Sequence, residues 1–171
     1  MWRWAVGVLA AVSALAIGAG SAVAGDPPMV EEFPASFVLT SDTCSNLAPG
    51  TRLEGTGTGV SITRTQTDAH GVTTVSNVTR IHGTAVDQAG NSYAFSYANA
   101  FRVSNTGPED PIFSGLMVDD FTLAGHGPAH LENGFVAVFT TDFESLFSFR
   151  ELHSRGDPID FATGASRCDP L

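Results

Sequence analysis

The chain contains no lysine, and its eight arginines are outnumbered by 18 aspartates and glutamates, which gives a formal net charge of −10. No stretch of the sequence gathers basic residues into a local cluster. Such a balance repels nucleic acids and anionic lipid surfaces. We therefore expect no nucleic-acid partner and, once the protein is exported, no stable insertion in a membrane.

Cysteine is also scarce, since Cys44 and Cys168 are the only two. Two cysteines in an oxidising compartment usually pair, so we predict one disulfide between them. A bridge across so long a stretch stabilises a fold by about 4 to 5 kcal/mol in the chain-entropy model. The alternative is a free thiol acting as a nucleophile, for which the sequence offers no supporting signature.

Long apolar runs are absent except near the N-terminus, where Ala5 to Ala19 is almost wholly apolar and follows Arg3. This run is shorter than the roughly 20 residues that span a bilayer as a helix. Ala22-Val23-Ala24 provides a small-x-small cleavage site before Gly25. The pattern predicts a signal peptide and a secreted protein, and the alternative is a retained N-terminal anchor.

The remaining length suits one domain. We expect a signal peptide over residues 1–24, a flexible leader over residues 25–33 and a β-barrel domain over residues 34–171.

Helical periodicity with a cap is missing throughout, and the pattern instead favours strands. Residues 80–99 are typical of two strands joined by a type I turn over residues 87–90, in which Asp87 caps the backbone and Gly90 is left-handed. With a bulge at Gly90, the register separates two kinds of side chain. One side of this hairpin carries Ile81, Tyr93, Phe95 and Tyr97, and the other carries Arg80 and His82.

Residues 68–71 repeat the same turn pattern and align the preceding strand with this hairpin. The alignment places Gly59, Ile81 and Tyr97 in one row across three strands, and Gly57, Gly83 and Phe95 in the next. Glycines at alternate positions leave room for aromatic rings and let a strand coil sharply, as closure of a barrel requires.

Further strand patterns complete an antiparallel meander of six to eight strands in sequence order. Residues 135–152 fit either one long strand or two strands that meet near Asp142. We expect an all-β protein whose single meander closes into a small up-and-down β-barrel. The other expected strands are Ala35–Thr40, Arg52–Thr67, Ile112–Gly125 and Ile159–Arg167.

The order of local patterns supports a resemblance. A Cys follows the first strand, GTGTG lies in the second, and HGTAVDQAGNSYAF, DDFTLAGHG and Cys168 follow. In this layout, signal peptide included, the chain resembles small secreted β-barrel proteins of high-GC Gram-positive bacteria. It is more distantly similar to calycin and allene-oxide-cyclase-like barrels, although the Gly-x-Trp signature of lipocalins is absent. The resemblance implies a barrel and no particular reaction.

The aromatic side of the central hairpin is the candidate ligand-binding surface. If it faces the interior, an apolar ligand would contact Ile81, Tyr93, Phe95 and Tyr97. If the opposite side lines the interior, Arg80 and His82 become anchors for an anionic ligand. Residue types favour the aromatic side inside.

Two further groups of residues suggest chemistry. His126, His130 and Glu132 are the only metal-ligand candidates, and solvated histidines on a polar rim are the favoured alternative. Asp119 and Asp120 interrupt an apolar strand. An inward carboxylate could act as a general base, whereas a bulge, the favoured interpretation, would send both to solvent.

The absence of a recognisable nucleophile or catalytic constellation favours a non-catalytic protein without a cofactor. We expect a secreted barrel that binds a small apolar molecule or a cell-envelope partner. The alternatives are a barrel enzyme with isomerase- or cyclase-type acid–base chemistry and a structural protein with a solid core.

Overall fold

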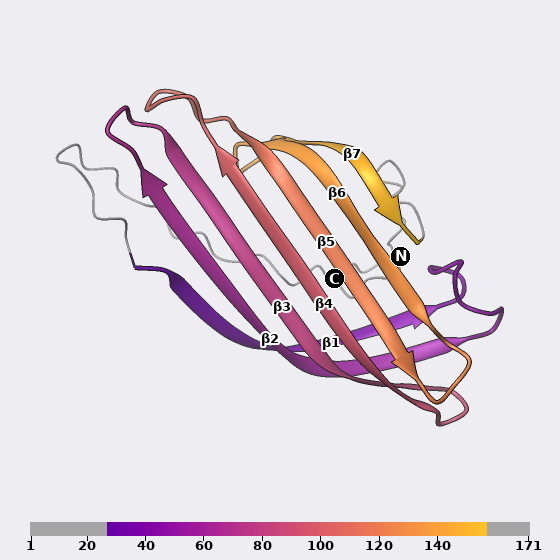
Figure 1. Ribbon diagram of the computed structural model, residues 1–171. Coiled ribbons are helices and arrows are strands. Elements are labelled where there is room, and N and C mark those ends of the chain that lie inside the picture. Colours follow the sequence, from indigo (N-terminus) through magenta and orange to yellow (C-terminus); the bar gives the residue numbers. More distant parts are fainter. Residues whose placement is uncertain (1–26, 157–171) are drawn as a thin grey trace.

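The computed structural model describes residues 27–156, which form one antiparallel sheet of seven strands without a helix in this part of the chain. The strand order follows the sequence, so the sheet is a meander (Figure 1). This confirms the all-β class and the antiparallel meander. The strands are β1 (Met29–Thr40), β2 (Arg52–Thr67), β3 (Thr73–Asp87), β4 (Ser92–Ser104), β5 (Phe113–Gly125), β6 (Leu131–Thr141) and β7 (Phe147–Arg155).

Several expectations lie outside the described residues. These are the signal peptide over residues 1–24, the strand Ile159–Arg167 and Cys168. Within the described part, β1 begins at Met29, so the segment expected to be a flexible leader already contributes five residues, 29–33, to the sheet.

The turn between β3 and β4 has the predicted geometry. Asp87 Oδ1 accepts hydrogen bonds from the backbone N–H groups of Ala89 and Asn91, each at 2.9 Å. Gly90 has a φ of 84° and donates to the Asp87 carbonyl. Asp68 caps the β2–β3 turn in the same way, through His70 and Val72. The repeated pattern therefore fixes two turns by one mechanism.

The predicted register is also confirmed. Gly59 pairs with Ile81 and Ile81 with Tyr97, while Gly57 pairs with Gly83 and Gly83 with Phe95. A Cβ atom built on Gly83 would lie 2.7 Å from Cε1 of Phe95, and one on Gly57 would lie 3.0 Å from its Cζ. The ring of Phe95 therefore occupies the space that the two glycines leave.

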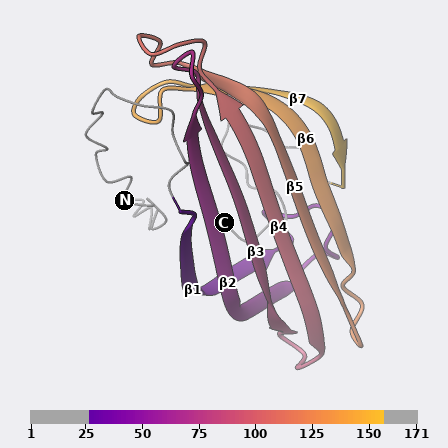
Figure 2. The same ribbon diagram turned by 60° about the vertical axis from the view of Figure 1, so that its left-hand side comes forward.

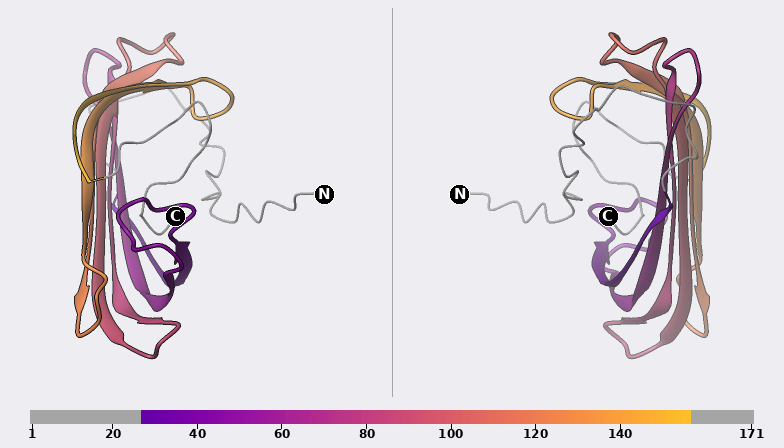
Figure 3. Two further views of the ribbon diagram at one scale, coloured as in Figure 1. Left: turned by 90° about the vertical axis from the view of Figure 1, so that its right-hand side faces the viewer. Right: turned by 90° about the vertical axis from the view of Figure 1, so that its left-hand side faces the viewer.

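The glycines of β2 receive two further rings from β1. Cβ atoms on Gly55 and Gly59 would collide with Phe37 and Phe33, which are their partners in the ladder. Stretches of β1 and β2 can therefore bend sharply, and Figure 1 shows both passing across the other strands. Figures 2 and 3 show the resulting curl of the sheet around one concave side.

Ring packing shows how far the sheet curls. Phe37 of β1 packs edge-on against Phe95 of β4 at 4.9 Å and against Phe121 of β5 at 6.0 Å between ring centroids. In a flat sheet these strands would be about 14 and 19 Å from β1. The curl therefore creates the core at one end of the concave side, which includes Phe37, Leu39, Leu53, Ile81, Ala85, Tyr93, Phe95, Phe121, Leu123 and Leu131.

The sheet does not close into the predicted barrel. Within residues 27–156, β1 pairs only with β2 and β7 only with β6. Instead, the loop after β1 contacts strand β6 through side chains. Asn46 in this loop donates from Nδ2 to Asn133 Oδ1 of β6 at 3.1 Å. At the core end, the packing of Phe37 against Phe95 and Phe121 and the contact of this loop with β6 take the place of a β1–β7 ladder.

The segment 135–152 contains parts of two strands, which settles the alternatives that the sequence left open. The β6–β7 turn forms because Asp142 Oδ1 accepts from the backbone N–H groups of Glu144, Ser145 and Leu146. Phe143 has a φ of 61° and is the one non-glycine residue with a positive φ in the described part. This turn projects toward the concave side (Figure 3).

Candidate functional site

The six predicted ligand-binding residues lie on two different faces. Ile81, Tyr93 and Phe95 are buried in the core, with Tyr97 packed against it. Arg80 and His82 are exposed on the outer face. The aromatic side therefore faces inward, as the residue types favoured, and the six do not form one site. Ile81, Tyr93 and Phe95 fill the core.

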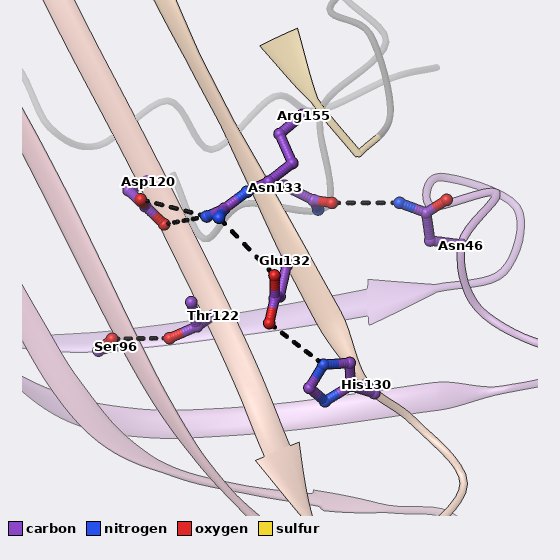
Figure 4. A network of polar contacts seen from close by, with 8 residues as sticks. All are labelled: Asn46, Ser96, Asp120, Thr122, His130, Glu132, Asn133 and Arg155. Atoms are coloured by element: carbon purple, nitrogen blue, oxygen red, sulfur yellow. Dashed lines mark hydrogen bonds and ion pairs between the residues drawn. The ribbon is translucent and has the colours of Figure 1, made fainter.

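The metal-ligand candidates come together only in part. His130 Nε2 lies 3.4 Å from Glu132 Oε1, and Glu132 also lies 3.7 Å from Arg155 (Figure 4). Among residues 27–156, no three histidine, cysteine, aspartate or glutamate side chains are placed to hold a metal ion, so His126 does not complete a site. These side chains are exposed and form a solvated network on the outer face.

Asp119 and Asp120 point to opposite faces of a regular ladder. Asp119 pairs with Asn99 and Phe135, while Asp120 pairs with Ala98 and Gly134, so no bulge interrupts β5 at this point. The favoured interpretation, a bulge that exposes both, is wrong. Asp120 is half exposed and accepts hydrogen bonds from Arg155 at 3.0 and 3.2 Å (Figure 4).

Asp119 is the buried carboxylate of the concave side, with an exposed fraction of 5%. Its Oδ2 accepts a hydrogen bond of 2.6 Å from the Tyr97 hydroxyl and one of 3.0 Å from Asn99 Nδ2. Burial of a carboxylate is unfavourable unless such donors replace water. Tyr97 and Asn99 hold the Asp119 side chain in one orientation.

A second group of polar side chains extends from Asp119 across the sheet. Asn77 Nδ2 donates to Ser61 Oγ and to Thr63 Oγ1, each at 2.8 Å, and Thr79 Oγ1 donates to Ser61 Oγ at 3.1 Å. These residues are half-buried on the concave side. We call the whole set the polar belt, which consists of Ser61, Thr63, Asn77, Thr79, Tyr97, Asn99 and Asp119.

An aromatic cluster lies beyond the polar belt. Along β4 the inward residues run from Phe95 in the core, through Tyr97 and Asn99, to Phe101. Phe101 packs edge-on against Phe139 at 5.8 Å, and Phe147 lies 5.9 Å from Phe139. Phe147 is 56% exposed. The polar belt therefore lies between the core and an aromatic cluster made up of Phe101, Phe135, Phe139, Phe147 and Phe149. Phe135 and Phe139 are buried, whereas Phe101 and Phe149 are half-buried.

The only tyrosine of the core has a structural role. The Tyr93 hydroxyl donates to Asp87 Oδ2 at 2.9 Å. Burial, and then this hydrogen bond, raise the pKa of Tyr93. Hydrogen bonds to the Asp87 carboxylate, above all the one from the side-chain amide of Asn91, lower the pKa of Asp87 to about 2. Asp87 therefore stays ionised and fixes the turn.

The site residues that sequence reasoning missed are the inward polar residues of the belt. The register predicted from the two turns already assigns Asn99, Thr79 and Ser61 to the side that carries Tyr97. Extending it along each strand would have predicted the belt. Asp119 was recognised, but β5 has no comparable turn pattern that fixes its register.

Comparison of the chain with protein-family models, curated proteins and solved structures gives no match. Among the described residues there is no helix long and apolar enough to cross a membrane. The candidate site therefore depends on geometry and chemistry alone.

Proposed function

We propose that the protein is a secreted, non-catalytic binding protein whose concave side takes up a small, largely apolar molecule. The observation that carries this proposal is the buried Asp119 of the polar belt, set between the core and an aromatic cluster whose Phe147 ring is exposed. An apolar body would lie against the exposed ring of Phe147 and the half-buried rings of Phe101 and Phe149, and one hydrogen-bonding group would reach the belt. This arrangement offers both affinity and orientation.

Acid–base catalysis is the second candidate, because Asp119 is an inward carboxylate. A catalytic carboxylate of this kind needs a proton-transfer partner within hydrogen-bond reach of the substrate. All five histidines, His70, His82, His126, His130 and His153, are exposed. The Tyr97 hydroxyl and the Asn99 amide both donate to Asp119 Oδ2 and orient the carboxylate. This favours binding over catalysis.

The proposal includes the disulfide between Cys44 and Cys168. Cys44 is 1% exposed and lies in the loop that contacts β6 through Asn46 and Asn133. Gly156 packs against the same Asn133 side chain.

The test is a titration with N-phenyl-1-naphthylamine, a neutral apolar fluorophore with one N–H donor, followed by native mass spectrometry of protein from its own culture medium. We expect saturable fluorescence enhancement and a retained small molecule. Phe101→Ala and Asp119→Asn should each weaken binding of the probe by about tenfold, the loss expected for one buried contact.

Asp120→Asn is the matched control, since it makes the same chemical change on the opposite face of the same strand. Equal affinity in the wild type and all variants, or no binding, would refute the proposed site. Turnover of a retained molecule that is lost in Asp119→Asn would support the catalytic alternative.

A further inference from the structure

An aliphatic row crosses the outer face of the sheet, opposite the proposed ligand site. Successive ladder pairs join Val30, Ile62, Val78, Ala100, Val118 and Val136, one from each strand from β1 to β6. Val30 is 58% exposed, Val118 47%, Val78 39% and Ile62 37%. At the usual strand spacing this apolar row is about 24 Å long.

A second row, one ladder step of two residues nearer the β2–β3 turn, carries three arginines. It joins Arg64, Ser76, Arg102, Leu116, Val138 and Arg150, from β2 to β7. The three guanidinium groups are exposed and have no ion pair or hydrogen bond within the described part of the chain. Leu116 adds a side chain that is 49% exposed.

These two rows contain no carboxylate, although the chain as a whole is acidic. The next row outward is also uncharged and consists of Gln66, Thr74, Ser104, Ser114, Thr140 and Ser148. On the other side, the first carboxylates are Glu32 and Asp120, and Asp120 is paired with Arg155. The fold thus assembles a basic, apolar surface from arginines that are far apart in sequence.

We propose that this outer patch, defined as the apolar row together with the arginine row, adsorbs to an anionic lipid surface. Guanidinium groups bind phosphate oxygens in a bidentate manner, and their long side chains can spread around an aliphatic contact. Exposed aliphatic groups gain free energy on leaving water. Charge complementarity and exposed apolar area therefore act on the same face.

The net charge of −10 does not prevent this contact. At physiological ionic strength the Debye length is about 8 Å, so the groups nearest the surface dominate at contact. The nearest turns carry Asp68, Asp110 and Asp142, whose carboxylates accept hydrogen bonds within their own turns. Two further carboxylates, Glu109 and Glu144, are exposed in these connections and lie at the edge of the patch, outside its two rows. Adsorption would be peripheral and reversible by salt, and it leaves the concave side open.

The test is co-sedimentation of the exported protein with vesicles of phosphatidylcholine alone or with about 30 mol% phosphatidylglycerol, an anionic composition that attracts basic segments. We expect binding to the mixed vesicles only, abolished in about 1 M NaCl, where the Debye length is about 3 Å. Each of Arg64→Gln, Arg102→Gln and Arg150→Gln should lower the partition coefficient about fivefold. Val118→Ser should lower it as well.

Two substitutions outside the patch serve as matched controls. Val86→Ser removes a valine of the same face that is 48% exposed, and Arg52→Gln removes an exposed arginine at the other end of the sheet. Unchanged circular dichroism would show that every variant is folded. No binding to the mixed vesicles, equal losses in the controls, or binding that the arginine variants leave unchanged would overturn the proposal. Equally tight binding to poly-L-glutamate through the same arginines would replace lipid with an acidic protein partner.

Discussion

Individual glycines decide where rings can lie in this sheet. Gly83 lacks a side chain because a Cβ atom there would meet the Thr56 carbonyl of β2 and the ring of Phe95. The neighbouring Thr84 is exposed on the outer face. Two adjacent positions of one strand therefore tolerate very different side chains.

We expect Gly83→Val to lower the free energy of unfolding by about 1 to 3 kcal/mol or more, the range for overpacking. Thr84→Val is the control and should be neutral or slightly stabilising, because valine favours strands. Thermal melts of both variants check this. Greater damage from Thr84→Val would show that the register is shifted by one residue.

The carboxylate of Asp87 links stability to pH. Its folded pKa of about 2 lies below the ordinary value of 3.8, so the folded state binds fewer protons than the unfolded state between these values. The stabilisation is present above about pH 4 and is lost as the pH falls through about 2. Urea unfolding of the wild type and Asp87→Asn should therefore differ at neutral pH and converge in acid. A constant difference across that range would contradict the role of the charge.

At the scale of elements, the turns and the first five strands were predictable, whereas the predicted closure into a barrel was wrong. Asp87 and Gly90, with Asp68 and Gly71, set two turns by local hydrogen bonds and positive φ values, so their register follows from sequence. The curl of the open sheet depends on long-range contacts such as Phe37 with Phe121 and Asn46 with Asn133. Local patterns do not contain that information. The register of the two turns does assign Ser61, Thr79 and Asn99 to one side, and only the position of Asp119 in β5 required the structure.

The β6–β7 turn contains a conformation that its own residue disfavours. Phe143 has a positive φ, which costs about 1 to 3 kcal/mol in a bulky residue. Its ring lies 5.2 Å from Phe113 but is 42% exposed, so the ring contributes little burial. Asp142 holds the backbone in place through three N–H groups. The strain is therefore imposed by the turn.

We expect Phe143→Asn to leave the midpoint of chemical unfolding unchanged or raise it, because asparagine tolerates the left-handed region. Phe147→Asn is the comparison, since Phe147 lies in β7 and contacts the rings of Phe139 and Phe149. That change should cost about 1 kcal/mol. If Phe143→Asn is the more damaging of the two, the ring of Phe143 matters more than its backbone.

At the scale of the whole molecule, the two proposed sites lie on opposite faces of the sheet. Arg64, Arg80, Arg102 and Arg150 are exposed on the outer face, whereas Asp119 is buried on the concave side. Either face can therefore be altered by substitution with little effect on the other. This separation makes the ligand and lipid proposals independently testable.

The proposed export and disulfide would affect the entire chain. We predict that the secreted protein begins at Gly25 and is two hydrogens lighter than its reduced mass, because Cys44 and Cys168 pair. Intact mass spectrometry before and after reduction measures both. A mass that includes residues 1–24, or two thiols that alkylate without reduction, would disprove these two expectations respectively.

The two hydrogen bonds from tyrosine to carboxylate also give the molecule a pair of built-in optical reporters. Both tryptophans, Trp2 and Trp4, precede the predicted cleavage site, so the emission of the exported chain would come from Tyr93 and Tyr97. Tyr93 donates to Asp87 beside the core, and Tyr97 donates to Asp119 in the belt. Tyr93→Phe would leave Tyr97 as the sole emitter, and Tyr97→Phe would leave Tyr93. Ultraviolet spectroscopy without any added label could then follow the occupied site and the folded core one at a time.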